Sequence, residues 1–376
     1  MTPFKAPIYV TRPFLPPLAE FCKGLEKIWE SRLLTNYGPQ VRRFEKLLTE
    51  YVHSENICLF TNGTLALQIG LQGMNISGEV ITTPFTFVAT AHALYWDKIR
   101  PVFCDIEPEY FTLNPDRIET LITPWTTAIL AVHVFGYPCQ LERLQAIAHK
   151  HHLTLLYDAA HAFGVSVNNQ PISEFGDLSM FSFHATKPYH SLEGGMLVFK
   201  DSGLKQKFFY LQNFGFKTEI EVVMPGTNAK MNELQALMGI QVLQHIDSLI
   251  EQRRQVDAVY RERLRDIPGL KMPPELPQHI GYNYAYVPVE IYECEFGVSR
   301  DGLYEELKTF NIFTRRYFYP LVCDFSCYRS LAVTDPLTIA RGVADRILTL
   351  PVYHDLPIDN VHRICDAIIH IRKRHT

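Results

Sequence analysis

Short continuous apolar runs alternate with stretches of helical periodicity through the first two hundred residues of the chain. The runs that predict buried strands are 57–60, 79–82, 101–104, 128–133, 154–157, 178–183 and 196–199. Helical spacing of apolar positions lies between them, at 64–73, 86–96, 115–120, 141–151 and 201–213. Continuous apolar strands joined through helices favour a mostly parallel sheet that is covered on both faces. Such a sheet binds ligands at the carboxyl ends of its strands.

The pattern differs at the two ends of the chain. Prolines interrupt the arm through Pro17, and two amphipathic stretches follow it, at 18–29 and 41–51. A long helical stretch at 231–265 leads to a second region of strand and helix patterns, at 284–291, 300–310 and 361–372. We therefore predict a large domain over 1–250, including the arm, and a smaller C-terminal αβ domain over 251–376.

Composition and charge narrow the class of protein. The 376 residues allow about two to three domain units. A net charge of −4 without a basic cluster argues against nucleic acid as a partner. Eight scattered cysteines without a CxxC pair indicate reduced thiols. Since no 18-residue apolar run occurs and the proline-rich start lacks the apolar core of a signal peptide, we expect a cytoplasmic protein without a membrane span.

One lysine lies between two of the predicted strands, in the segment 181–195. Ser182 precedes Lys187 by five residues, and Gly194 and Gly195 follow it. A lysine enclosed by apolar segments loses hydration, its pKa falls, and its amine becomes a usable nucleophile. Enzymes that use pyridoxal 5′-phosphate (PLP) need such an amine beside a phosphate site. A surface lysine in a loop is the alternative.

Two strand-to-helix junctions could complete such a site. Gly63 and Thr64 open a helix, where backbone N–H groups and the helix dipole attract a phosphate, although an ordinary helix cap would look the same. Phe87, in the segment 83–87 after the next strand, could stack on a pyridine ring or could be a core residue.

An acid ends a further strand. Asp158 follows an apolar run, and a buried carboxylate there needs a partner such as a protonated pyridine nitrogen. A surface carboxylate and a metal pair with His161 are the alternatives, but no third ligand stands at a plausible spacing, so no metal is expected. The succession of phosphate loop, aromatic, carboxylate, serine and lysine along the chain predicts a PLP site.

Two other polar clusters have weaker interpretations. The run 149–152 contains three histidines and reads as a solvated helix end rather than a metal site. The run 315–317 contains two arginines, which could bind an anionic group or form a charged loop.

The residues described above resemble those of the DegT-like sugar aminotransferases over nearly the whole chain. The matching segments are 35–39 with 44–45, 61–64, 84–90, 158–161, 182–187, 193–195, and 226–228 with 231–235. The resemblance implies the aspartate-aminotransferase fold (PLP fold type I), a mostly parallel mixed sheet flanked by helices with a smaller C-terminal αβ domain.

The resemblance also implies a role for each matched residue. Lys187 would carry the cofactor, Asp158 would bind the pyridine nitrogen, Phe87 would cover the ring, and His161 would lie against the ring or its hydroxyl. Gly63, Thr64 and Ser182 would hold the phosphate. Asn228 would reach the cofactor of a neighbouring subunit, which implies a homodimer with active sites at the subunit interface. The chain departs from the family pattern at Pro188 and by lacking an aromatic residue near Ala229.

The activity implied is transfer of the amino group of L-glutamate to a nucleotide-linked keto-sugar. Relatives with histidine at the position of Lys187 dehydrate their substrates, so this lysine favours transamination. The runs 79–93 and 131–136 are similar to those of enzymes acting on dTDP-linked keto-6-deoxyhexoses. We expect a 4-keto substrate and a product used for deoxyamino sugars of surface glycans such as O-antigen. The alternatives are the 3-keto isomer, an amino alcohol precursor or cyclitol acceptor, and a PLP-binding regulatory protein without turnover.

Overall fold

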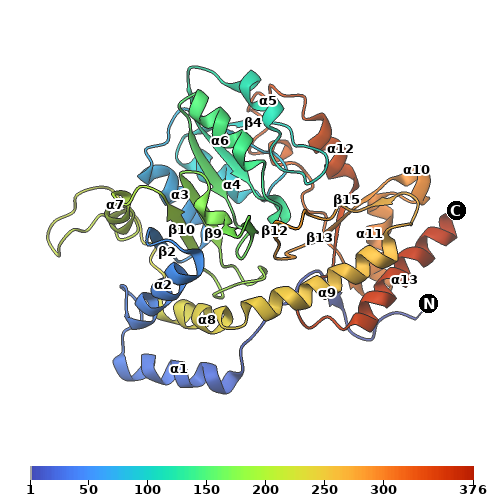
Figure 1. Cartoon of the computed structure of the whole chain (residues 1–376), viewed down its shortest axis with the longest axis horizontal. Helices are drawn as coiled ribbons and strands as arrows, with labels where there is room; N and C mark the ends of the chain where they lie inside the picture. Colours follow the sequence, from blue (N-terminus) through green and yellow to red (C-terminus); the bar gives the residue numbers. More distant parts are fainter. Residues whose placement is uncertain (1) are drawn as a thin grey trace.

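A seven-stranded sheet forms the centre of the computed structural model, which describes residues 2–376 (Figure 1). Its strands, in spatial order, are β2 (Ile57–Phe60), β10 (Gly195–Phe199), β9 (Leu178–Ser182), β6 (Thr154–Asp158), β5 (Thr126–Val132), β3 (Glu79–Thr82) and β4 (Arg100–Phe103). β10 runs antiparallel to both of its neighbours, and the other neighbouring pairs are parallel. The predicted mostly parallel mixed sheet is therefore confirmed.

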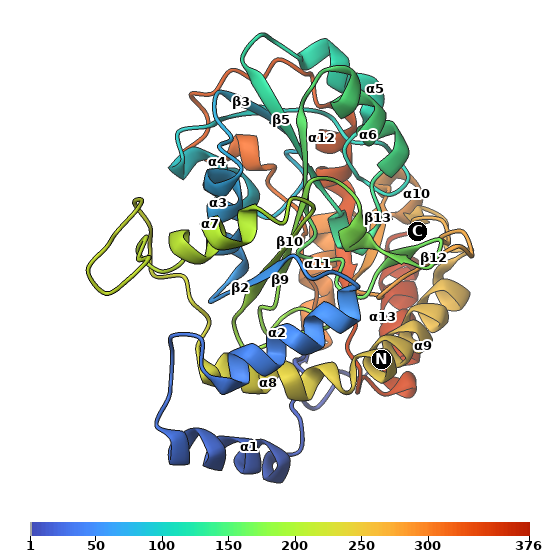
Figure 2. The ribbon, with the colours of Figure 1, turned by 60° about the vertical axis from the view of Figure 1, so that its left-hand side comes forward.

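Helices cover both faces of this sheet (Figure 2). One face packs against α2 (Pro39–Val52), α6 (Leu141–Lys150) and α8 (Glu233–Leu243). The other packs against α3 (Gly63–Gly73), α4 (Ala89–Trp96) and α7 (Leu204–Leu211). Successive strand residues enter opposite cores, as Leu155 and Leu156 do, because side chains alternate along a strand. Burial on both faces explains why these strands read as unbroken apolar runs.

A second core lies in the C-terminal part of the chain. It holds the antiparallel sheet β11 (Leu270–Lys271), β13 (Val287–Ile291) and β15 (Ile347–Leu350), with α9 (Ile246–Leu264), α11 (Arg300–Thr309) and α13 (Ile358–His375). The stretch predicted as one helix at 231–265 is two helices, α8 and α9, which meet at residues 244–245. The division of the chain into domains 1–250 and 251–376 stays a prediction.

The N-terminal arm joins the C-terminal core. β1 (Ile8–Tyr9) pairs in parallel with β14 (Ile312–Phe313), and Phe4 is buried in that core. α1 (Leu18–Ser31) then lies beside α8, with one buried residue, Ile28. The N-terminal segment thus contacts both the C-terminal core and a helix of the central sheet's layer.

The remaining elements are short. They are β7 (Ser166–Val167), β8 (Gln170–Pro171) and β12 (Ile280–Gly281), which form one small sheet, and the helices α5 (Pro115–Ile118), α10 (Glu293–Phe296) and α12 (Thr338–Arg346). The loop between α7 and α8 projects from the body of the molecule (Figure 2). Within residues 2–376, every helix is too short or too polar to cross a membrane.

Candidate active site

A cavity of about 640 Å³ opens at the carboxyl ends of the central strands. Seven of the eight residues predicted to bind the cofactor line it: Gly63, Thr64, Phe87, Asp158, His161, Ser182 and Lys187. The sheet brings them together because β2, β3, β6 and β9 each deliver the residues at one end to the same edge. The topological rule used on the sequence therefore predicted correctly that these residues meet at one edge of the sheet.

The end of the cavity formed by α3 is suited to a phosphate. The side chain of Asn62 caps α3 by accepting the N–H of Leu65 at 2.9 Å, so Thr64 is not the cap. A Cβ atom added to Gly63 would lie 3.0 Å from the Cβ of Ser182, and one on Gly195 would lie 2.6 Å from the carbonyl oxygen of Asn62. Glycine at both positions lets the helix start approach β9 and β10 closely. The result is a helix N-terminus flanked by two hydroxyl groups, a combination that favours anion binding.

Asp158 is held rigidly at the end of β6. Its side chain accepts a hydrogen bond from the Thr90 hydroxyl at 2.7 Å and another from the N–H of Ala160 at 3.1 Å. Burial raises the pKa of Asp158, while the bonds from Thr90 and Ala160 and the charge of Lys187 act against that rise. The carboxylate lines the cavity, so a cation placed there would favour its charged form.

His161 follows Asp158 by three residues, lines the same cavity and is almost fully buried. The N–H of Phe135 donates to Nδ1 at 3.1 Å, which assigns the proton of the neutral ring to Nε2. Burial, together with the charge of Lys187, lowers the pKa of His161 well below its ordinary value. The ring of Phe318 stacks parallel to the imidazole, with centroids 5.9 Å apart. A neutral, oriented imidazole therefore forms part of the cavity wall.

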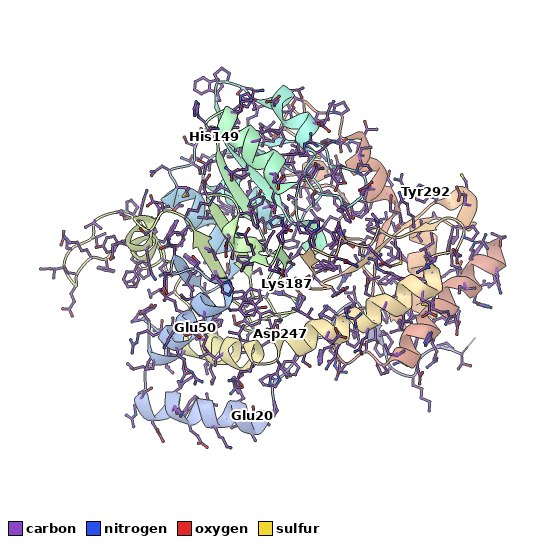
Figure 3. The ribbon with its side chains drawn as sticks, in the orientation of Figure 1. Glu20, Glu50, His149, Lys187, Asp247 and Tyr292 are labelled. Atoms are coloured by element: carbon purple, nitrogen blue, oxygen red, sulfur yellow. The ribbon has the colours of Figure 1, made fainter. Side chains whose placement is uncertain are left out.

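Lys187 lies near the centre of the molecule (Figure 3). Burial lowers the pKa of Lys187 to about 8, against the opposing effect of Asp158. Its backbone is fixed by the neighbouring Tyr189, whose hydroxyl donates to the carbonyl of Gly239 at 3.0 Å and whose ring stacks on Phe163. Pro188 is buried, and the lysine side chain nevertheless reaches the cavity. The alternative of a surface lysine is therefore wrong.

The two phenylalanines of the segment 83–87 differ in environment. Phe85 is fully buried in a core of aromatic rings, whereas Phe87 is 59% exposed and lines the cavity. The interpretation of Phe87 as a core residue is thus wrong. Its ring is free to cover a planar group in the cavity.

Asn228 is separate from the other predicted residues. It is exposed in the loop between α7 and α8, and its backbone pairs with Asn213. It does not line this chain's cavity, as far as the described residues show. Its contact with a neighbouring subunit stays a prediction.

The weaker candidates have structural partners. Lys150 and His151 both bind Glu119, at 2.7 and 2.8 Å, on the surface of α6. Arg316 binds Asp301 at 2.9 Å, but the next residue, Tyr317, lines the cavity.

Several cavity residues were not singled out from the sequence as site residues. Thr86, His184 and Glu193 lie in segments that match the family, whereas Tyr286 and Phe318 lie outside those segments. Tyr286 and Phe318 come from the C-terminal part of the chain, about a hundred residues or more from Lys187, so only the tertiary packing brings them to the site. Thr90 could have been found as a hydroxyl on the first turn of the helix that follows β3.

Comparisons with known proteins agree with this geometry. The chain is 43% identical to dTDP-4-amino-4,6-dideoxy-D-glucose transaminase of Shigella dysenteriae over 366 residues, which cover 97% of this chain and 99% of that protein. It is 42% identical to the Escherichia coli protein of the same name, with 96% and 98% covered. The structure superposes on DesI, solved in the presence of its TDP-sugar product, with a TM-score of 0.94 and 36% identity over 100% of this chain and 95% of that one.

A more distant structure shares the same fold. PseC of Helicobacter pylori, an aminotransferase of pseudaminic acid biosynthesis, gives a TM-score of 0.92 at 27% identity and covers 98% of this chain and 100% of that one. The predicted aminotransferase fold of type I is thereby confirmed. The model of the DegT/DnrJ/EryC1/StrS aminotransferase family matches residues 18–369. The chain therefore belongs to this family of sugar transaminases, as its residues predicted.

Proposed function

We propose that the protein moves the amino group of L-glutamate to a dTDP-linked 4-keto-6-deoxyhexose, with PLP as its cofactor. The observation that carries this proposal is the placement of Lys187, Asp158 and the helix start at Gly63 in one cavity. The 43% identity to a dTDP-4-amino-4,6-dideoxy-D-glucose transaminase supports the choice of sugar. The product class serves the synthesis of deoxyamino sugars in surface glycans such as O-antigen, and the enzyme is proposed to be cytoplasmic.

The residues present fit PLP in two respects. The start of α3, with Thr64 and Ser182, offers N–H and hydroxyl donors to a phosphate. The carboxylate of Asp158 has a raised pKa, which a pyridinium proton at hydrogen-bond distance would offset. Opposite charges about 4 Å apart attract by about 4 kcal/mol at an effective dielectric near 20. When bound, PLP supplies an electron sink for the carbon that exchanges its amino group.

The remaining steps fall to the side chains of the cavity. With a pKa of about 8, about a tenth of Lys187 is neutral at pH 7, far more than for an ordinary lysine, so its Nζ can act as nucleophile and as general base. Nζ removes the proton from the α-carbon of glutamate and returns a proton on the sugar side. His161 and Phe87, which both line the cavity, would cover the cofactor ring, and the carboxylate of Asp158 would hold its pyridine nitrogen. The two substrates use one site in turn, which predicts ping-pong kinetics.

A second subunit is part of this proposal. Asn228 lies on an exposed loop with several exposed apolar residues, among them Phe214, Ile220 and Val222. We propose that this loop packs on a second copy of the chain and that Asn228 there reaches the cofactor of that copy, in a homodimer.

Two tests separate this function from its alternatives. The purified, loaded protein is expected to absorb visible light and to bleach with L-glutamate, whereas a PLP-binding regulatory protein would keep its colour. A panel of dTDP-, UDP- and GDP-linked keto-sugars, with the amine position of each product read by NMR, then identifies the acceptor. Amination at carbon 3 would favour the 3-keto isomer over the 4-keto sugar.

Substitution of Lys187 tests the same proposal through the loss of turnover. Lys187→Ala is expected to lower turnover by at least about 10³-fold, since it removes both nucleophile and base. Lys200→Ala, which removes an exposed lysine at the end of β10, serves as the control and should keep wild-type turnover. Turnover retained by Lys187→Ala would refute the proposal.

A further inference from the structure

The segment 282–286 connects β12 to β13, and its last residue, Tyr286, lines the active-site cavity. Two adjacent residues of this segment donate hydrogen bonds to backbone carbonyls in the loops that follow strands of the central sheet. The Tyr282 hydroxyl donates to the carbonyl of Phe135 at 3.0 Å. The side-chain amide of Asn283 donates to the carbonyls of His161 and Phe163, at 2.7 and 2.9 Å. The segment is therefore fixed against the loops that carry His161.

A buried arginine holds the segment from the other side. Arg253, on α9, is 3% exposed and donates from one nitrogen to the carbonyls of Tyr284 and Ala285, at 3.3 and 3.4 Å. These two carbonyls directly precede Tyr286. Burial lowers the pKa of Arg253 to about 10, yet the guanidinium stays charged at neutral pH. Burying the Arg253 guanidinium costs desolvation free energy, and its hydrogen bonds to the two carbonyls offset part of that cost. These bonds fix the backbone that leads into Tyr286.

Tyr286 ends the segment inside the cavity. Its ring packs edge-on to His161, with centroids 4.9 Å apart, and contacts Phe135 and Tyr317. Its hydroxyl oxygen accepts a hydrogen bond from Lys187 Nζ at 3.3 Å. The ring thus has one orientation, set by three aromatic neighbours, and that orientation presents the hydroxyl to the lysine.

We propose that Tyr286 is a positioning residue that holds the free amine of Lys187 in the cavity, and that Arg253 positions Tyr286 through the carbonyls of Tyr284 and Ala285. The inference rests on the proposed function, because the Lys187 amine needs a hydrogen-bond partner in the cavity only if it leaves the cofactor during turnover. Tyr286 then keeps Nζ within the cavity while the lysine is free. Without the hydroxyl, the flexible four-carbon side chain samples more rotamers.

The electrostatic surroundings of Lys187 set the sign of the expected effect. The titratable groups that line the cavity with Lys187 are Asp158, His161, His184, Glu193, Tyr286 and Tyr317, and His184 and Glu193 pair with each other at 3.4 Å. Burial raises the pKa of Tyr286 well above its ordinary value, so the phenol is neutral and its oxygen accepts from the ammonium. A hydrogen bond to the charged form favours that form. Its loss should therefore lower the pKa of Lys187 further.

The first test measures the amine itself in the full chain freed of cofactor. Reaction of Lys187 with fluorodinitrobenzene is followed across pH, with the labelled peptide quantified by mass spectrometry. Tyr286→Phe is expected to lower the pKa of Lys187 by about one unit relative to the wild type. Tyr284→Phe is the matched control, because it removes a hydroxyl from the same segment at a position that does not contact Lys187, and it should leave this pKa unchanged. An unchanged or raised pKa in Tyr286→Phe, or an equal fall in both variants, would overturn the proposal.

The second test uses the loaded enzyme. Tyr286→Phe is expected to lower kcat about tenfold, with the KM for glutamate changed less than about twofold. The acidic limb of the kcat–pH profile is expected to move to lower pH. A raised KM with unchanged kcat would contradict a role in holding the lysine. Since the labelling experiment needs no turnover, its outcome stays separate from that of the proposed function.

Arg253→Lys tests the second half of the proposal and replaces Tyr286→Phe should that variant not fold. It keeps the charge but replaces the guanidinium nitrogen that bonds both carbonyls with the compact, more strongly hydrated ammonium of a lysine. The pKa of Lys187 is expected to fall in the same direction as in Tyr286→Phe, by a smaller amount. A pKa equal to that of the wild type would exclude Arg253 from this role.

Discussion

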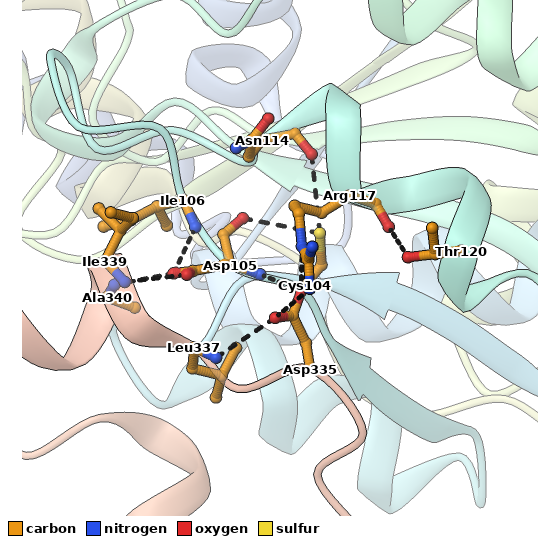
Figure 4. Close-up of polar contacts among 10 residues, drawn as sticks. All are labelled: Cys104, Asp105, Ile106, Asn114, Arg117, Thr120, Asp335, Leu337, Ile339 and Ala340. Carbon is orange, nitrogen blue, oxygen red and sulfur yellow. Dashed lines mark hydrogen bonds and ion pairs between the residues drawn. The ribbon is translucent and has the colours of Figure 1, made fainter.

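Two aspartates follow parallel strands of the central sheet and are equally well buried, with 5% of Asp158 and 6% of Asp105 exposed. Asp158 ends β6, and Asp105 comes two residues after β4. Asp105 accepts three backbone N–H groups, from Ile106 at 2.9 Å and from Ile339 and Ala340 at 2.9 and 2.8 Å (Figure 4). The last two belong to the first turn of α12, so Asp105 caps a helix from a distant part of the chain.

The surroundings of Asp105 strengthen this structural role. Its own N–H donates to Asp335, which also binds Arg117 at 3.2 Å (Figure 4). Asp158, in contrast, has two hydrogen-bond donors and opens onto the cavity that holds Lys187. A buried acid at a strand end is thus structural when a helix start occupies its oxygens, and it is available for chemistry when it faces a cavity.

Replacing each aspartate with a neutral residue should give the largest difference, a loss of kcat at Asp158 and a loss of stability at Asp105. Asp158→Asn removes the negative charge from the cavity and is expected to lower kcat by about 10³-fold, the equivalent of about 4 kcal/mol. Asp105→Ala leaves helix N–H groups unpaired and is expected to lower the free energy of unfolding by about 2 kcal/mol, with kcat changed less than about threefold. Steady-state kinetics and urea unfolding of both variants check this. Equal losses of activity in the two variants would remove the distinction.

Lys187 should lower the free energy of unfolding, whereas the contacts of Asp105 raise it. Its folded pKa of about 8 lies below the ordinary value of 10.5, so between these pH values the unfolded chain holds a proton that the folded chain has released. The free energy of unfolding therefore rises with pH across this window, and below pH 8 the fold carries the full cost of the buried ammonium. Lys187→Met should raise the free energy of unfolding of the cofactor-free chain at pH 7 by on the order of 2 kcal/mol. Urea unfolding at pH 7 measures it, with Lys200→Met as the control, and a less stable Lys187→Met protein would contradict this reading.

The orientation of Asp158 should matter less than its charge. Thr90→Val removes the hydroxyl that donates to the carboxylate and keeps the shape of the side chain. Losing a donor to the charged form raises the pKa of Asp158, so we expect kcat to fall about tenfold and most strongly at acidic pH. A pH–rate profile of the variant checks the direction, and a profile parallel to that of the wild type would show that Thr90 does not tune this group.

Much of this site could be predicted from the sequence because its residues lie at local junctions. Lys187, Asp158 and Gly63 each follow an apolar run, and the rule for parallel sheets brings such junctions to one edge. The antiparallel direction of β10 and the break between α8 and α9 had no comparable local signal. The chain also offered no way to tell Asp105 from Asp158, since the helix that occupies Asp105 begins more than two hundred residues later. Tyr286 was missed for the same reason, because its contact with Lys187 spans 99 residues.

The central claim is that Lys187 carries the cofactor while Asp105 and its neighbours only support the fold. Reduction of the PLP-loaded protein with borohydride, followed by proteolysis and mass spectrometry, tests it most directly. One phosphopyridoxyl group is expected, on the peptide that contains Lys187. A label on another lysine, or a loaded protein that yields no label, would contradict it.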